Sequence, residues 1–170
     1  ADPNGGAFKD YQNHLILIKD LKENFIKTLF NYDNYETRHS PVFYIFLSFF
    51  YSLEIPDKII RLIFLHIGIL LPIIFYKCLK LKFSSTDKEK LVLFSCLILL
   101  SPSFWSLTIW PDSRIFGLLL FCVSILYFLK FKEDEKLSNS IKCIISYSVA
   151  SYISPNFAVF SIFYFYHFFK

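Results

Sequence analysis

The sequence predicts an all-α, polytopic transmembrane helix bundle with an interfacial amphipathic helix and a short juxtamembrane helix. The chain has 170 residues, of which 55% are hydrophobic and 19% are charged, whereas soluble domains have about 45–50% and about 25%. The apolar residues form long runs: residues 59–76 contain one Arg and one His, and residues 91–109 contain no charge. Runs of about 18 or more apolar residues indicate transmembrane helices. This pattern excludes a soluble globule, a disordered chain and a disulfide scaffold.

The rest of the composition excludes several functions. The net charge of +4 is mild and spread along the chain, so no nucleic-acid partner is expected. The four cysteines show no C-x-x-C spacing and lie in or beside apolar runs, which favours packing roles. No nucleotide-binding loop or metal-binding cluster occurs, so we expect no cofactor and no metal. Because the chain lacks Met and starts in a polar stretch, we interpret it as a fragment of a larger protein.

The first helix is expected over residues 13–29. Its apolar positions recur at steps of three and four, and they are Leu15, Ile18, Leu21, Phe25 and Leu29. This spacing predicts an amphipathic helix. Because its other face is charged, the helix is too polar to span a bilayer, and we expect it to lie in the membrane interface. The alternative is that it packs on other parts of the protein.

A short apolar helix follows a polar loop at residues 31–40. Ser40 is placed as its cap and Pro41 as its first-turn proline. Residues 42–53 extend about 18 Å, less than the ~30 Å of a hydrocarbon core. We therefore expect a juxtamembrane or re-entrant helix, with a strained span as the alternative. Residues 1–58 are interpreted as a non-cytoplasmic loop region, and residues 59–170 as the transmembrane bundle.

The bundle is predicted to contain about five spans. They are residues 59–76, 91–109, 115–129, 141–153 and 157–169. The loop at 77–90 carries five Lys and the region 130–142 carries four, while the turn at 110–114 has one basic residue. The positive-inside rule makes the Lys-rich loops cytoplasmic. Asp10, His39 and Asp112 then share the opposite face, provided that residues 42–53 do not cross the membrane.

Two acids on that face could carry chemistry. Asp10 could act as a general base toward a hydroxyl acceptor, and the alternative is a solvated loop acid. His14 lies near Asp10 only if the helix already starts there. Asp112 is expected to cap the helix that begins near Ser113. Arg114 could pair with Asp112 or bind a lipid phosphate.

Three further polar residues have two interpretations each. Arg38 and His39 could hold a phosphate or pyrophosphate, or they could anchor the chain at the interface. His66 lies inside the first span, where an ionisable residue is a functional candidate. The alternative for His66 is a neutral side chain that is hydrogen-bonded to a neighbouring helix.

The order of these segments resembles the GT-C superfamily of polytopic glycosyltransferases, which includes protein mannosyltransferases and lipid A aminoarabinose transferases. The similar features are a first loop with an acid, the segment HSPVFYIFLSFF, and a span opened by Arg61-Leu62. A basic turn, the segment LLSPSFW and the outer turn WPDSR follow in the same order. The family pattern has an extra Pro or Lys where this chain has Ser40.

The resemblance implies transfer of a sugar from a polyprenyl-phosphate donor to a lipid, glycan or protein acceptor at the non-cytoplasmic face. By similarity, the catalytic base is Asp10, with Asp2 as a weaker candidate, and Asp112 positions a substrate. Arg38, His39 and Arg114 would hold the donor phosphate, and His14 would contribute to substrate binding. The expected location is a multi-pass position in a bacterial inner membrane, in contact with membrane lipid.

Two other classes of function stay open. A transporter or lipid flippase would bury ionisable groups or broken helices near the middle of the membrane, where this chain offers only His66 and Pro72. A structural subunit of a membrane assembly would need no acids gathered on one side. Substitution of Asp10 and Asp112 separates the structural role from an enzyme.

Overall fold

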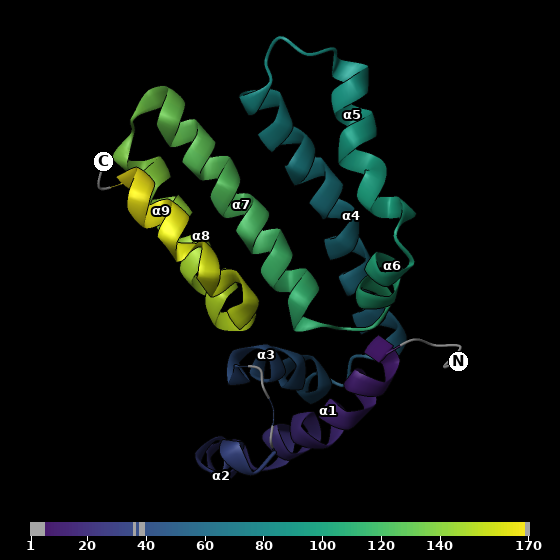
Figure 1. Cartoon of the computed structure of the whole chain (residues 1–170). Helices are drawn as coiled ribbons and strands as arrows, with labels where there is room; N and C mark the ends of the chain where they lie inside the picture. Colours follow the sequence, from purple (N-terminus) through teal and green to yellow (C-terminus); the bar gives the residue numbers. More distant parts are fainter. Residues whose placement is uncertain (1–5, 36, 38–39, 169–170) are drawn as a thin grey trace.

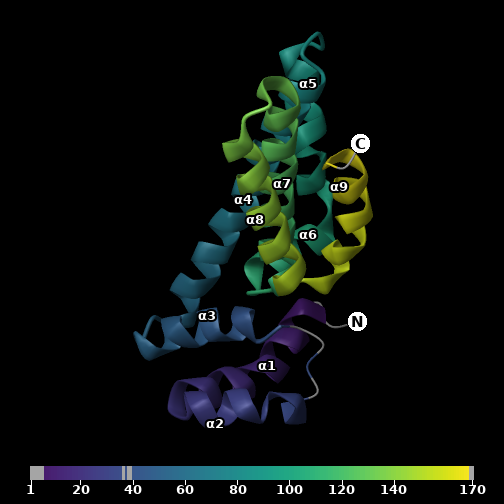
Figure 2. The same cartoon turned by 90° about the vertical axis from the view of Figure 1, so that its left-hand side faces the viewer.

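The chain folds into an upright group of helices that stands on a second layer of helices (Figure 1). The computed structural model describes residues 6–35, 37 and 40–168, and every regular element in these ranges is a helix. The helices α4 to α9 form the upright group, and α1, α2 and α3 run crosswise at its foot (Figure 2). The all-α prediction is therefore confirmed for the described residues.

The amphipathic helix begins earlier and ends earlier than predicted. The helix α1 covers Gly6–Glu23, and the chain breaks at Asn24 before α2, Phe25–Phe30. Ile18 and Leu21 of the predicted apolar face are buried, while Phe25 and Leu29 are exposed. The buried face of α1 packs on α3, so its apolar residues contact protein, which was the alternative interpretation. The 3-10 turn η1, Tyr32–Tyr35, follows α2.

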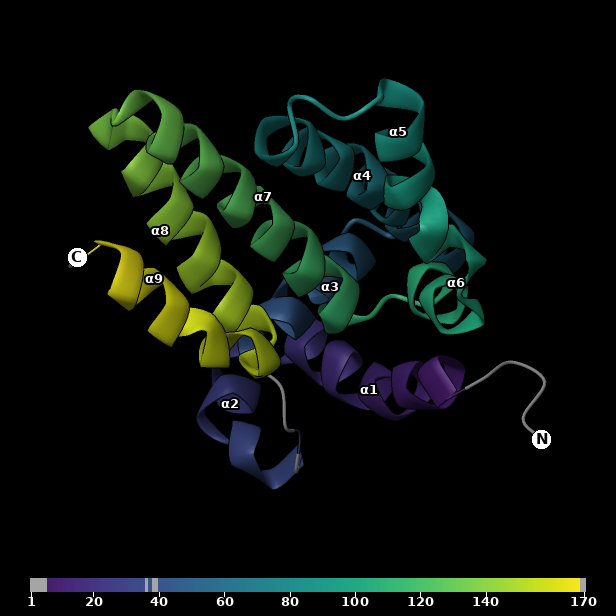
Figure 3. The same cartoon turned by 45° about the horizontal axis from the view of Figure 1, so that its top comes forward.

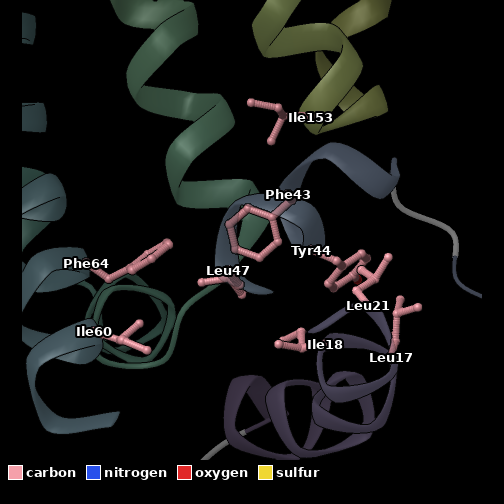
Figure 4. Packing of buried hydrophobic residues seen from close by; sticks show 9 residues of the cluster. All are labelled: Leu17, Ile18, Leu21, Phe43, Tyr44, Leu47, Ile60, Phe64 and Ile153. Carbon is pink, nitrogen blue, oxygen red and sulfur yellow. The ribbon is translucent and has the colours of Figure 1, made fainter. Parts of the chain in front are cut away.

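The short apolar helix α3 covers Pro41–Ser52. Ser40 caps it as predicted, because its hydroxyl accepts a hydrogen bond from the Val42 backbone N–H over 3.2 Å. The helix lies between α1 and the upright helices. Figure 4 shows the cluster that fills this junction. Its members come from α1, α3, α4 and α8, and they are Leu17, Ile18, Leu21, Phe43, Tyr44, Leu47, Ile60, Phe64 and Ile153.

Two helices are long and apolar enough to cross a membrane. They are α4, Asp57–Lys82, and α7, Ser113–Asp134. The helix α7 packs between α4 and α8, Leu137–Ile153, and Figure 3 shows the three side by side. Large apolar side chains stay exposed on α4 and α8, as expected of helices that contact lipid. The structure therefore supports association with a membrane.

The predicted span at 91–109 is broken. It consists of α5, Lys88–Cys96, the 3-10 turn η2, Leu97–Leu100, and α6, Pro102–Ile109, with a bend of 71°. The break falls at Ser101, which is extended because a residue before proline avoids the helical region. The segment is either one bent span or a re-entrant loop.

The C-terminal hairpin differs from the prediction at both helices. The helix α8 begins four residues earlier than predicted, and the predicted segment 157–169 is divided between η3, Pro155–Phe160, and the short α9, Ser161–Phe168. With 17 residues in α8 and eight in α9, these helices are shorter than the roughly 20 residues that a span needs. The described residues thus contain two candidate spans, or three if the bent pair is counted as one. The prediction of about five spans is not confirmed.

Candidate functional site: an acid cluster at the foot of the bundle

A buried acid lies directly before α7. Asp112 caps this helix, as predicted, because its Oδ1 accepts a hydrogen bond from the Arg114 backbone N–H over 2.7 Å. The same carboxylate binds the Arg114 guanidinium, with 3.0 Å from Nε to Oδ1 and 2.7 Å from Nη2 to Oδ2. Only 10% of the Asp112 side chain is exposed. Both oxygens of Asp112 are thus already used by protein donors.

Arg114 also reaches the acid of α1. Its Nη2 lies 3.3 Å from Oδ2 of Asp10, which is 104 residues earlier in the chain. The Asp10 side chain is 55% exposed, so part of this carboxylate faces solvent. Asp10, Asp112 and Arg114 therefore form one cluster, which we call the acid cluster. The two acids lie at the same end of the molecule, as a shared site requires.

A hydrogen-bonded chain fixes α1 beside this cluster. The Tyr11 hydroxyl contacts the Tyr51 hydroxyl of α3, and Tyr51 donates to Oδ1 of Asp57 over 2.7 Å. Because Tyr51 gives its proton to Asp57, Tyr11 is the donor to Tyr51. This chain joins the beginnings of α1 and α4 through the end of α3. Because Tyr11 directly follows Asp10, this chain of hydrogen bonds fixes the part of α1 that carries Asp10.

Trp110 also packs against this part of α1. Its ring lies 4.6 Å from the Phe8 ring and 5.8 Å from the Tyr11 ring, between centroids. The Arg61 guanidinium stacks over Trp110 at 4.0 Å and donates from Nε to the Ile109 carbonyl over 3.2 Å. Arg61 thus joins α4 to the end of α6.

A small cavity lies between the acids. Its volume is about 20 Å³, and Asp10, His14, Tyr44 and Asp112 are among its lining residues. This volume holds about one water molecule and is far below the ~300 Å³ of a small-ligand pocket. The cavity can admit a hydroxyl-sized group next to Asp10, and anything larger has to lie on the exposed side of the cluster.

A contact between two aromatic rings, those of His14 and Tyr44, forms part of the cavity lining. Because α1 already begins at Gly6, His14 lies one helical turn after Asp10, and its ring is 4.8 Å from the ring of Tyr44. Burial is the main reason that the pKa of Tyr44 is raised above its ordinary value, and the negative charges of Asp10 and Asp112 add to the shift. The Tyr44 phenol therefore stays protonated at neutral pH.

The charges of the cluster define what it can do. Two carboxylates and one guanidinium carry a formal charge of −1, so the cluster does not offer net positive charge to a phosphate. Asp112 is occupied and nearly buried, and Asp10 has one arginine contact and an open side. Asp10 is thus the acid that can accept a proton from an incoming hydroxyl group.

The structure brings some of the sequence-predicted residues together and not others. The structure brings together Asp10, His14, Asp112 and Arg114. Arg38, His39 and Asp2 lie outside the described residues. His66 is exposed on α4, and its Nδ1 contacts the Leu62 carbonyl of the same helix over 2.7 Å rather than a neighbouring helix. Among the described residues, no three His, Cys, Asp or Glu side chains gather as a metal site.

Sequence analysis did not predict the contributions of Tyr11, Tyr44 and Tyr51. Eleven tyrosines occur in the chain, and nothing in their spacing distinguishes these three. Their common signal is position, since they lie on the faces of α1 and α3 that meet.

Comparisons with family models, with curated proteins and with solved structures found no match to this chain.

Proposed function

We propose that this chain is part of a polytopic membrane glycosyltransferase of the GT-C type, which acts at the end of the bundle that carries the acid cluster. The observation that carries the proposal is the meeting of Asp10 and Asp112 at Arg114, although the two acids are 102 residues apart in sequence. A helix that serves only to pack does not need two acids around one arginine at the mouth of a cavity.

In the proposed reaction, Asp10 acts as the general base. Its carboxylate takes the proton from an acceptor hydroxyl, whose oxygen then forms a bond to the anomeric carbon of the sugar. The bond from that carbon to the donor phosphate oxygen breaks, and the polyprenyl phosphate leaves with the electron pair. Arg114 and Asp112 hold Asp10 in place and do not exchange protons.

The donor phosphate needs positive charge from outside the acid cluster, because the cluster itself has a formal charge of −1. Arg38 and His39 are the proposed partners for this phosphate, since guanidinium and imidazole groups bind phosphate oxygens well. The lipid tail of the donor stays in the bilayer, so only the sugar and phosphate have to reach the interface.

The test is Asp10→Asn in the full-length protein. Membranes that contain the variant are incubated with undecaprenyl phosphate carrying a radiolabelled hexose or pentose, and transfer of label to cellular acceptors is measured. Loss of a general base lowers a rate by roughly 10²–10⁴-fold. We expect a decrease in that range with unchanged expression.

The matched control is Asp33→Asn. Asp33 is an exposed acid in η1, in the same layer of helices, and it is outside the cluster. It undergoes the same change of charge and should keep full transfer activity. Full activity in Asp10→Asn would remove Asp10 from the reaction, and equal losses in both variants would assign the effect to surface charge.

The transporter alternative gains one observation, the broken segment from α5 to α6, because discontinuous helices often line transport sites. At this break, however, two of the backbone groups are bound internally. The Ser101 hydroxyl accepts from the Phe104 N–H over 3.3 Å, and the Trp105 indole donates to the Leu99 carbonyl over 2.6 Å. These two groups are engaged within the protein, which favours the transferase over an ion site at the break.

A further inference from the structure

A groove lies far from the acid cluster, at the end of the bundle with the Lys-rich loops. It has a volume of about 680 Å³ and is bounded by the last turn of α4, the second half of α7, and η3 with α9. Its walls are mostly apolar and include Phe121, Ile125, Phe128 and Phe163, with the His167 ring as a further lining group. None of these residues takes part in the acid cluster.

On the floor of the groove, the two described hydroxyl groups are bound to each other and to backbone. Phe128 and Tyr164 are both buried there. The Tyr164 hydroxyl is bound to the Ser124 hydroxyl over 2.7 Å, and Ser124 itself donates to the Phe121 carbonyl over 2.7 Å. Because these hydroxyl groups satisfy one another, the floor suits a hydrocarbon chain rather than a polar ligand.

The rim of the groove is charged. Lys82 and Lys132 lie there with Glu133, so two ammonium groups and one carboxylate give one net positive charge. Both lysines are exposed. Within the described parts of the chain, neither lysine forms an ion pair with a carboxylate. Both are therefore available to an anion outside the protein.

The depth of the groove corresponds to one leaflet of a bilayer. Phe121 and Lys132 are 11 residues apart on α7, which is about 17 Å of helix. Half of a ~30 Å hydrocarbon core is about 15 Å. With Lys132 at the level of the headgroups, Phe121 reaches the middle of the membrane.

We propose that this groove binds an anionic phospholipid, with one acyl chain along the apolar walls and the phosphate between Lys82 and Lys132. The charge of the rim, the apolar floor and the leaflet-like depth all match one such lipid. The inference rests on membrane insertion of α4 and α7 and is independent of the transferase chemistry. A failure of lipid binding would leave the role of Asp10 untouched.

The test is native mass spectrometry of the purified full-length protein after incubation with equal amounts of dioleoyl phosphatidylglycerol and dioleoyl phosphatidylcholine. The wild type should retain phosphatidylglycerol in preference to phosphatidylcholine. In the double variant Lys82→Gln/Lys132→Gln, the preference should decrease by about 30-fold, because each lysine near an anionic surface contributes roughly fivefold and the two factors multiply. Because both side chains are exposed, the variant should fold normally.

Two controls distinguish this site from general attraction. Lys77→Gln/Lys88→Gln removes the same charge from exposed lysines that do not line the groove, and it should keep the preference. Ile125→Trp fills the groove and should lower retention of both lipids, whereas Ile69→Trp on the exposed surface of α4 should not.

Three results would overturn the proposal. The first is equal retention of the two lipids by the wild type. The second is an unchanged preference in the Lys82→Gln/Lys132→Gln variant. The third is a wild type that retains no lipid, together with a crosslinker at residue 163 that captures another segment of the full-length protein. That segment would then occupy the groove.

Discussion

The two acids of the cluster should contribute differently to stability, and Asp112→Ala compared with Asp10→Asn measures the difference. Asp112 is 10% exposed and binds the Arg114 backbone N–H and guanidinium. Asp10 is 55% exposed and has one 3.3 Å contact with the same guanidinium. The structure thus makes Asp112 the structural acid and Asp10 the accessible one.

The magnitudes follow from these contacts. Removal of an N-cap costs about 1 kcal/mol, and loss of hydrogen bonds to a charged group costs about 1.5–3 kcal/mol. Asp112→Ala should therefore lower the free energy of unfolding by about 3 kcal/mol. An exposed ion pair contributes about 0–1 kcal/mol, so Asp10→Asn should cost less than about 1 kcal/mol. Asp112→Asn, which keeps a good capping residue, should fall between these values.

The assay is thermal unfolding of the detergent-purified protein, followed by the fluorescence of Trp105 and Trp110. A change of 1 kcal/mol shifts Tm by about 2–4 °C for 150–250 residues. Asp112→Ala should shift Tm at least three times as much as Asp10→Asn. Equal shifts, or a larger shift for Asp10→Asn, would refute the division of roles between the two acids. They would also refute the assignment of Asp10 as the accessible general base.

Three other substitutions test the supports of the cluster. In Gly68→Ala, the added Cβ would lie 2.3 Å from Cγ2 of Thr108, so Tm should fall by an amount equivalent to about 1–3 kcal/mol. Thr108→Ser, which removes that Cγ2, should restore part of the loss. An unchanged Tm in Gly68→Ala would show that α4 and α6 separate easily. Arg61→Lys removes the planar stack on Trp110 at 4.0 Å, so stability should fall by about 1 kcal/mol and the Trp emission should change, whereas an unchanged spectrum would contradict the contact. Burial is the first cause that raises the pKa of Tyr11, Tyr44 and Tyr51 above 10.0. The neutral phenols therefore contribute fully to the stability of the folded protein below about pH 10, and this contribution decreases as pH rises further. Tyr44→Phe should flatten the fall of Tm between pH 9 and 11, and an equal slope would argue against a buried phenol.

The sequence is sufficient to predict those features that depend on local chemistry. Ser40 and Asp112 are placed correctly as helix caps, because a cap needs only its own side chain and the next turn of backbone. The apolar runs likewise predict α4 and α7 as candidate spans, since length and composition alone decide whether a helix can cross a bilayer.

Features that depend on contacts between distant segments were less predictable. The apolar face of α1 was expected at a membrane, but it packs on α3, and hydrophobic spacing alone does not distinguish lipid from protein. The bend at Ser101 has a local signal in Pro102, but proline is also tolerated within packed membrane helices. The contact between Asp10 and Arg114 spans 104 residues. Sequence could predict only that both residues lie on one face.

The two ends of α7 connect the proposed site with the proposed lipid groove. Arg114 at its beginning holds the acid cluster, and Lys132 near its end lies on the rim of the groove. The two residues are 18 positions apart, which corresponds to about 27 Å of helix, close to the ~30 Å of a hydrocarbon core. A bilayer that meets Lys132 at one headgroup level therefore meets Arg114 at the other. Under the proposed function, Asp10 then lies at the membrane surface, the level at which a lipid-linked sugar and an aqueous acceptor can meet.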